Sequence, residues 1–170
     1  MDKNKIKNFV KDILQVAIAV FVILFICFKF LFISVEVEGT SMVPTLHNKD
    51  RGFSFIITRN IGIKRFDVCV IDSEKTNKLI VKRVIGMPND TVVYKDNKLY
   101  INGTYYEEDY LAEDAYTEDL EITLGDNEYF CLGDNRNVSR DSRYYGTFTY
   151  EEIKSTNVFV YYPFTDFGAK

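Results

Sequence analysis

The sequence has no tryptophan and a single histidine in 170 residues. A Ser-His-Asp triad would have to use that histidine, His47. It stands in a polar turn with Asn48, Lys49 and Asp50, so we interpret it as an exposed loop residue. The Ser-x-x-Lys motif of penicillin-binding enzymes is also absent, because no serine has a lysine three positions later. A nucleophilic serine in this chain therefore needs a base from elsewhere.

Cysteine is scarce, with three residues and no Cys-x-x-Cys pair. This spacing argues against a zinc site or a dense disulfide framework, and no other pattern calls for a metal or a cofactor. Cys69 and Cys131 each stand among apolar, strand-like neighbours, and Cys27 lies in a long apolar run. We expect buried, unreactive thiols, with a Cys69–Cys131 disulfide in an exported domain as the alternative.

Positive charge is sparse beyond the N-terminus. Residues 1–33 carry five basic and two acidic side chains, whereas residues 34–170 carry 16 basic and 23 acidic ones. This balance argues against nucleic acid as a partner. Residues 107–121 hold eight acidic residues and no basic one, which indicates a solvated excursion between strands. Cation binding is the alternative there, although the ligand spacing of an EF-hand is absent.

A long apolar run follows the basic N-terminus. Between residues 13 and 33, every residue is apolar except Gln15 and Lys29. As a helix this run would be about 31 Å long, close to the hydrocarbon thickness of a bilayer. We predict a cytoplasmic tail over residues 1–12 and a membrane-spanning helix over residues 13–33. A cleavable signal peptide is the alternative, but no small-residue cleavage site follows the run.

The charges that flank the apolar run predict its orientation. Lysines precede it, whereas Glu36 and Glu38 follow it. Basic residues next to a span favour the cytoplasmic side. We therefore expect a single pass through the cell membrane, with residues 34–170 on the extracytoplasmic face.

After residue 34 the pattern changes to short strands rich in β-branched and aromatic residues. The expected strands are residues 35–37, 52–57, 67–71, 79–85, 91–94, 99–101, 121–124, 129–132 and 158–162. One helical turn is predicted at residues 149–154, where Thr149 can cap and Glu152 follows three positions later. The fold class is thus mostly β, with one transmembrane helix followed by a single β-rich domain over residues 34–170.

Residues 39–46, GTSMVPTL, contain a candidate nucleophile. Gly39 permits backbone angles closed to other residues and Pro44 fixes φ, so the segment predicts a turn that holds Ser41 in one presentation. A serine hydroxyl is a poor nucleophile until a neighbouring base takes its proton. The base must come from another part of the chain.

Lys82 is the candidate for that base. A lysine accepts a proton near neutral pH only if its pKa falls from about 10.4, and removal from water lowers it. Lys82 lies in the apolar stretch LIVKRVI at residues 79–85, where strand alternation puts Lys82 and Arg83 on opposite faces. The pattern does not say which cation is buried, but arginine cannot give up its proton. Lys64 is the rival base, and an exposed edge-strand cation is the alternative interpretation of Lys82.

A third polar stretch, GDNRNVSRDSR at residues 133–143, follows a predicted strand. Its glycine and small polar residues suit a tight loop, and its alternating charges suit Asp–Arg pairs within that loop. By itself this pattern fits any charged surface turn.

Together these stretches resemble bacterial type I signal peptidases, particularly the small single-span form of Gram-positive bacteria. The matching blocks are the apolar anchor and residues 39–45, 65–71, 81–90 and 133–143, in that order. The resemblance implies Ser41 as nucleophile and Lys82 as general base. It also implies that Ser139 bonds the lysine amine and that Asp141 and Arg143 brace the site.

Three positions depart from the pattern of that family. Phe66 and Asn89 stand where glycine is usual, and Gly39 stands where some members have a serine that donates to the oxyanion. The first two lie at turns, so they concern local backbone geometry rather than chemistry. With Gly39, the oxyanion would depend on backbone N–H groups, chiefly that of Ser41.

The resemblance implies a membrane-anchored serine endopeptidase that removes signal peptides from secretory preproteins at the lipid bilayer, cutting after small residues. Met42, Ile80 and Val81 border the two catalytic candidates in sequence and are candidates for lining small substrate pockets. One alternative is a membrane-tethered β-rich protein that grips extended peptides without cutting them. Another is a self-cleaving repressor-type protease, although those proteins carry a DNA-binding region where this chain has an apolar run.

Overall fold

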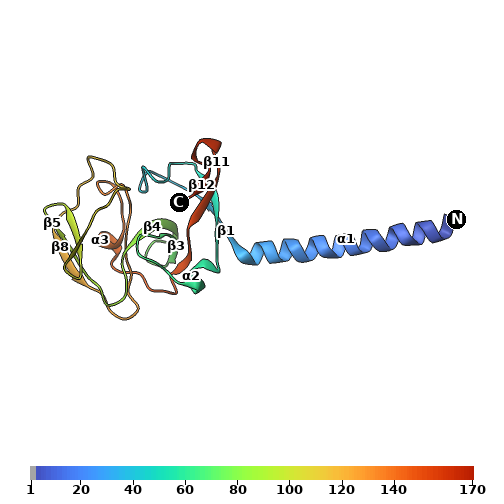
Figure 1. Cartoon of the computed structure of the whole chain (residues 1–170), viewed down its shortest axis with the longest axis horizontal. Helices are drawn as coiled ribbons and strands as arrows, with labels where there is room; N and C mark the ends of the chain where they lie inside the picture. Colours follow the sequence, from blue (N-terminus) through green and yellow to red (C-terminus); the bar gives the residue numbers. More distant parts are fainter. Residues whose placement is uncertain (1–2) are drawn as a thin grey trace. The chain divides into compact units, whose positions relative to one another are not determined.

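The computed structural model describes residues 3–170, and the chain divides into two compact units, Met1–Phe32 and Ile33–Lys170 (Figure 1). Helix α1, Lys3–Leu31, makes up most of the first unit. Its segment Ile6–Ile26 is long and apolar enough to cross a membrane. The helix begins well before the predicted span, because the lysine-rich tail contains no glycine or proline that would stop it. Cys27 lies outside the described side chains.

The second unit contains three four-stranded sheets. The first has the order β1 (Phe32–Glu36), β2 (Arg51–Phe55), β11 (Val158–Tyr162), β12 (Gly168–Ala169). The second has the order β10 (Ile153–Thr156), β3 (Val68–Ser73), β4 (Lys78–Gly86), β9 (Phe130–Leu132). The third has the order β7 (Thr104–Tyr106), β6 (Lys98–Ile101), β5 (Thr91–Lys95), β8 (Leu120–Thr123). Three short helices complete the unit: α2 (Thr58–Ile61), α3 (Ser142–Tyr145) and the 3-10 helix η1 (Phe164–Asp166).

The sheets join strands that are far apart in sequence. Strand β2 pairs antiparallel with β11, which follows it by about a hundred residues, and the two lie side by side in Figure 1. The mostly β fold class predicted from the sequence is confirmed, and each expected strand overlaps an observed one. Strands β7, β10 and β12 and the short helices α2, α3 and η1 were not predicted. Each has four residues or fewer, too few for hydrophobic periodicity to show.

The predicted helical turn at residues 149–154 is correct only at its start. The Thr149 N–H donates to the Glu152 carboxylate at 2.8 Å, as a capping box requires. No helix follows, because the chain enters β10 at Ile153, whose side chain is fully buried. Burial of a β-branched residue in the sheet prevails over the local capping signal.

Strand β4 is covered on both faces. Val84 packs with Cys69 and Cys131 in one buried cluster, whereas the next residue, Ile85, packs in another cluster with Leu132. This explains why the sequence of β4 reads as a nearly continuous apolar run. Cys69 and Cys131 are free, buried thiols, so the alternative of a disulfide between them is wrong. Burial raises the pKa of the Cys131 thiol.

Backbone geometry accounts for two of the departures noted above. Phe66 and Asn89 have φ values of 70° and 67°, in the left-handed region that favours glycine. Asn89 adopts this region readily, whereas Phe66 does so at some cost in strain. The ring of Phe66 packs against those of Tyr106 and Tyr110, at centroid distances of 5.8 and 6.0 Å. We infer that this aromatic packing offsets the strain.

Candidate active site

The turn that carries Ser41 lies between β1 and β2. Its backbone is closed by hydrogen bonds from Val43 N–H to the Thr40 carbonyl and from Leu46 N–H to the Met42 carbonyl. The side chains of Met42 and Leu46 are buried in the cluster that also contains Val68 and Val70 of β3. These two apolar anchors fix the turn to the sheet, so Ser41 is held in place by its neighbours.

Lys82 reaches Ser41 from strand β4. Its Nζ donates to Ser41 Oγ at 2.8 Å and to the Val81 carbonyl at 2.9 Å. Lys82 is 3% exposed and lies directly opposite Cys69 of β3, so its stem is surrounded by the buried apolar cluster of that face. In the described part of the chain, Lys82 has no carboxylate within ion-pair distance. The two residues singled out from the sequence are thus in direct contact.

Burial also sets the proton affinity of this amine. Desolvation lowers the pKa of Lys82 from 10.5 to about 8, and the more distant carboxylates of Asp141 and Asp134 only partly oppose it. A substantial fraction of Lys82 is therefore neutral at mildly alkaline pH. A neutral amine can accept the proton of the Ser41 hydroxyl through the same 2.8 Å contact.

Asp141 and Arg143 hold the loop of residues 133–143. Arg143 donates to the Asp141 carboxylate through Nε at 2.9 Å and Nη2 at 2.8 Å. The Gly133 N–H donates to the same carboxylate at 3.0 Å. Burial by itself would raise the pKa of Asp141, but these hydrogen bonds and the charge of Arg143 lower it. The same carboxylate caps α3 by accepting the Arg143 N–H. The pair thus joins the two ends of this loop through hydrogen bonds.

The loop is docked directly onto the Ser41 turn. Asn135 N–H donates to the Ser41 carbonyl at 3.0 Å. A Cβ atom at Gly133 would overlap both the Ser41 carbonyl oxygen and Ser139 Oγ. Only glycine allows the two segments to approach this closely.

Ser139 is placed differently from the expectation. Its Oγ is buried and forms no hydrogen bond with the Lys82 amine, so the implied bond is not formed. The hydroxyl lies instead against Gly133, close enough to the Asp141 carboxylate to contribute to the lowering of its pKa.

Arg83 lies on the opposite face of β4 and is also buried. It binds Asp134 through Nε at 2.9 Å and Nη2 at 2.6 Å, and donates to the Phe66 carbonyl at 2.8 Å. Its guanidinium lies 4.0 Å from the centre of the Tyr110 ring. Sequence reasoning missed this pair. The feature of the sequence that could have indicated a partner for Arg83 was Asp134, an acidic residue in the same polar stretch as Asp141.

A second buried pair involves the acidic run. Arg136 Nη2 donates to Glu108 Oε1 at 2.6 Å, and Arg136 Nη1 donates to the Tyr94 hydroxyl at 2.8 Å. The prediction of a wholly solvated run is therefore wrong at Glu108, whose side chain is 8% exposed. This carboxylate ties the third sheet to the loop of residues 133–143.

A groove of about 540 Å³ opens over the two contacting side chains. It is lined by Ser41, Lys82 and the three pocket candidates Met42, Ile80 and Val81, together with Glu36, Val37, Glu38, Lys78, Leu79, Arg140 and Tyr145. His47 and Lys64 are not among the lining residues, and both are exposed. The structure thus brings together the preferred base and the pocket candidates and leaves the two rival bases outside.

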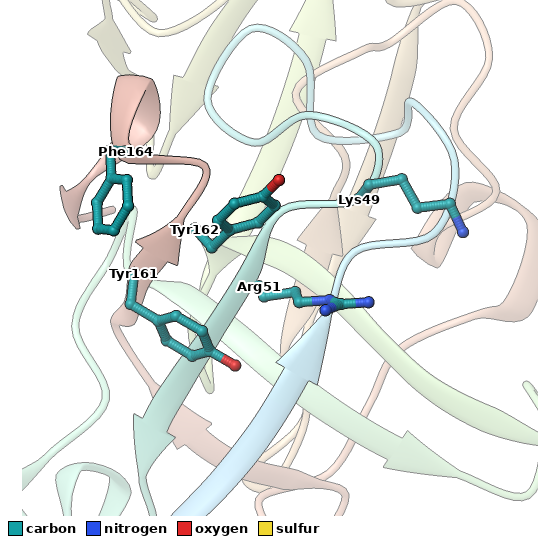
Figure 2. A pocket seen from close by; sticks show the side chains of 5 residues that line it. All are labelled: Lys49, Arg51, Tyr161, Tyr162 and Phe164. Carbon is teal, nitrogen blue, oxygen red and sulfur yellow. The ribbon is translucent and has the colours of Figure 1, made fainter.

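A second hollow, of about 410 Å³, is shown in Figure 2. Tyr161, Tyr162 and Phe164 line one side, and Lys49 and Arg51 line the other. Both cations are exposed and lie within 4 Å of the Glu36 carboxylate. This hollow has no serine and no desolvated amine, so it lacks a nucleophile and a base.

A serine hydroxyl in contact with a desolvated lysine amine, at an open groove, is an arrangement that supports nucleophilic catalysis by serine without a histidine base. The family model described as signal peptidase, peptidase S26 matches residues 7–162. The chain belongs to this family. It is a serine endopeptidase of the signal peptidase I type, which confirms the resemblance drawn from the sequence.

Individual relatives agree with the family assignment. Signal peptidase I S of Bacillus subtilis (strain 168) is 40% identical, over 88% of this chain and 88% of the relative. Signal peptidase I of Streptococcus pneumoniae R6 is 34% identical, over 97% of this chain and 98% of the relative. The crystal structure of a signal peptidase I from Enterococcus faecalis V583 is 33% identical, with a TM-score of 0.51 over 55% of this chain and 95% of that one.

Proposed function

We propose that this enzyme removes signal peptides from secretory preproteins by means of a Ser41–Lys82 dyad. The observation that carries the proposal is the 2.8 Å contact between Lys82 Nζ and Ser41 Oγ, made by a lysine whose pKa is about 8. Neutral Lys82 takes the Ser41 proton as Oγ attacks the scissile carbonyl. The ammonium so formed then protonates the leaving amine as the peptide bond breaks.

The second half of the reaction uses the same two residues. The first half leaves the signal peptide esterified to Ser41 and returns Lys82 to its neutral form. Lys82 then takes a proton from water, the resulting hydroxide attacks the ester carbonyl, and Ser41 recovers its proton as the ester bond breaks. In both halves the oxyanion would be bound by backbone N–H groups, chiefly that of Ser41, because Gly39 has no side-chain hydroxyl.

The groove supports a preference for small side chains before the cut. Its lining beside the dyad consists of Met42, Ile80 and Val81, which present apolar surface and no charge. In an extended peptide, the first and third residues before the cut point to the same side. We propose that both meet this apolar lining, which leaves room for alanine-sized side chains and no partner for a charged one.

Ser139, Asp141 and Arg143 are proposed as supporting residues. The Asp141–Arg143 pair keeps the loop of residues 133–143 against the Ser41 turn. The Ser139 hydroxyl, which makes no close hydrogen bond in the described part of the chain, is proposed to orient Lys82 when the amine changes its protonation state.

We further propose that α1 anchors the enzyme in the cell membrane by a single pass, with the N-terminus in the cytoplasm. The length and composition of Ile6–Ile26 support the anchor, and the lysines before it support the orientation. Residues 34–170 would then meet preproteins on the extracytoplasmic face.

The experiment incubates the detergent-solubilised full-length protein with a preprotein and sequences the new N-terminus of the product. We expect one cut after an Ala-x-Ala sequence, and no cut by Ser41→Ala. The alternative, a peptide-gripping protein without turnover, predicts binding of the preprotein with no product. Equal cutting of substrates with alanine and with lysine at the third position before the cut would contradict the proposed specificity.

A further inference from the structure

The groove over the dyad is lined by two carboxylates, and both of them have cationic partners. Glu38 accepts from Lys78 at 3.2 Å. Glu36 lies 3.3 Å from Arg51 and 3.8 Å from Lys49. Among the lining residues in the described part of the chain, these pairs leave no acidic group available to a further cation.

Apart from the proposed base Lys82, Arg140 is the lining cation without a carboxylate partner in the described part of the chain. It stands between Ser139 and Asp141 and is exposed. The adjacent Asp141 is not available, because its carboxylate is occupied by Arg143 and by the Gly133 N–H. The described contact of the Arg140 guanidinium is with the ring of Tyr144, 5.4 Å from its centre. Such stacking orients a guanidinium and leaves its N–H groups free to donate.

We propose that Arg140 is a specificity-determining residue that binds a carboxylate of the substrate on the released side of the cut. The proposal rests on the proposed function. The first and third residues before the cut are assigned to the apolar lining, which excludes a charge, and the second points away from it. We assign the acidic side chain that meets Arg140 to the first few residues of the mature protein, where aspartate or glutamate should favour cleavage over lysine.

The test compares substrates that share one signal peptide and differ only after the cut. Asp, Asn and Lys are placed in turn at each of the first three released positions, and kcat/KM is measured for the full-length enzyme in detergent. The Asn substrate gives the reference rate of each variant. In the wild type we expect Asp to exceed Lys by about twofold to fivefold at one position or more, the range of an exposed charge pair.

Four variants separate charge from structure. Arg140→Gln should bring the Asp-to-Lys ratio close to one, Arg140→Glu should invert it, and Arg140→Lys should retain most of it. Lys95→Gln, which removes the same charge from an exposed residue at the end of β5, should keep the wild-type ratio. Raising the salt concentration to about 1 M should shrink the ratio in the wild type, because the Debye length falls to about 3 Å.

A ratio that is the same in wild type and in all Arg140 variants would overturn the proposal. A charge preference confined to positions before the cut would overturn it as well. Absence of cleavage of every substrate by the wild type would instead remove the proposed function, so the two failures are distinguishable.

Discussion

The two faces of strand β4 bury two neighbouring cations in opposite ways. Arg83 is 8% exposed and Lys82 is 3% exposed, so both have lost most of their water. Arg83 donates two hydrogen bonds to the Asp134 carboxylate, so it forms a buried salt bridge. Lys82 is bonded only to a hydroxyl and a carbonyl in the described part of the chain, and burial lowers its pKa to about 8. Burial therefore has different consequences for the two side chains, because arginine cannot give up its proton, whereas a desolvated lysine can.

The comparison implies that the two faces should respond differently to mutation. A buried ion pair that loses one member leaves the other charge uncompensated, which costs about 3–5 kcal/mol. A desolvated lysine with no ionic partner leaves no such charge behind when it is replaced. Replacing Lys82 should therefore lower activity without lowering stability, whereas replacing Arg83 should lower stability first.

The largest effect is expected for the dyad itself. Ser41→Ala and Lys82→Ala should each lower kcat by about 1,000-fold or more, because each removes a group that acts in the chemical step. The double variant should be no slower than either single one, since the two residues act as a unit. Both single variants should keep a thermal midpoint near that of the wild type, measured by circular dichroism. Full activity of Lys82→Ala would show that the base is another residue.

The next effect concerns Arg83. Arg83→Met leaves the Asp134 carboxylate buried without its partner, so the thermal midpoint should fall by about 10 °C or more. Replacing both members, Arg83→Met with Asp134→Leu, should recover part of the loss. Arg51→Met, which removes an exposed arginine paired with Glu36, is the matched control and should shift the midpoint by about 2 °C or less. A larger fall in the thermal midpoint for Arg51→Met than for Arg83→Met would contradict the expectation that the buried pair matters more for stability than the exposed one.

The rate should depend on the protonation of Lys82. Desolvation lowers its pKa to about 8, and only the neutral amine accepts the Ser41 proton. The value of kcat/KM should therefore rise with pH, with a midpoint near 8 rather than near the 10.5 of a hydrated lysine. His47→Ala should keep this profile, because His47 is exposed and does not line the groove. Loss of the profile in His47→Ala would assign the proton transfer to the histidine.

A smaller effect is expected for Ser139. Its hydroxyl makes no close hydrogen bond, so Ser139→Ala should leave stability near that of the wild type while kcat falls by about tenfold. A loss of kcat without a loss of stability separates a positioning hydroxyl from a structural one. Wild-type turnover in Ser139→Ala would leave the residue without a catalytic role.

The sequence predicted the parts of the site that local patterns encode. The apolar run in β4 indicated a strand, and the lysine within it made Lys82 the preferred base over Lys64, with an exposed edge-strand cation as the alternative until the family resemblance was considered. The partners of Arg83 and Arg136 could not be predicted, because Asp134 and Glu108 come from segments 51 and 28 residues away along the chain. The position of Ser139 Oγ depends on the close approach of Gly133 to the Ser41 turn. Such contacts depend on the assembled sheets, which no local periodicity describes.

The smallest effect is expected for Lys64, the rival base considered from the sequence. Its side chain is exposed and lies outside the groove, whereas its backbone N–H donates to Asp67 in a connection before β3. Lys64→Ala therefore removes no contact with Ser41 and leaves no buried group unpaired, so kcat and the thermal midpoint should both stay close to wild type, within about twofold for kcat. The same alanine replacement at Lys82 should lower kcat by about 1,000-fold or more, so the two variants compare an exposed and a buried lysine by the same substitution. If kcat fell as much in Lys64→Ala as in Lys82→Ala, burial and contact with Ser41 would not explain which lysine is catalytic in this enzyme.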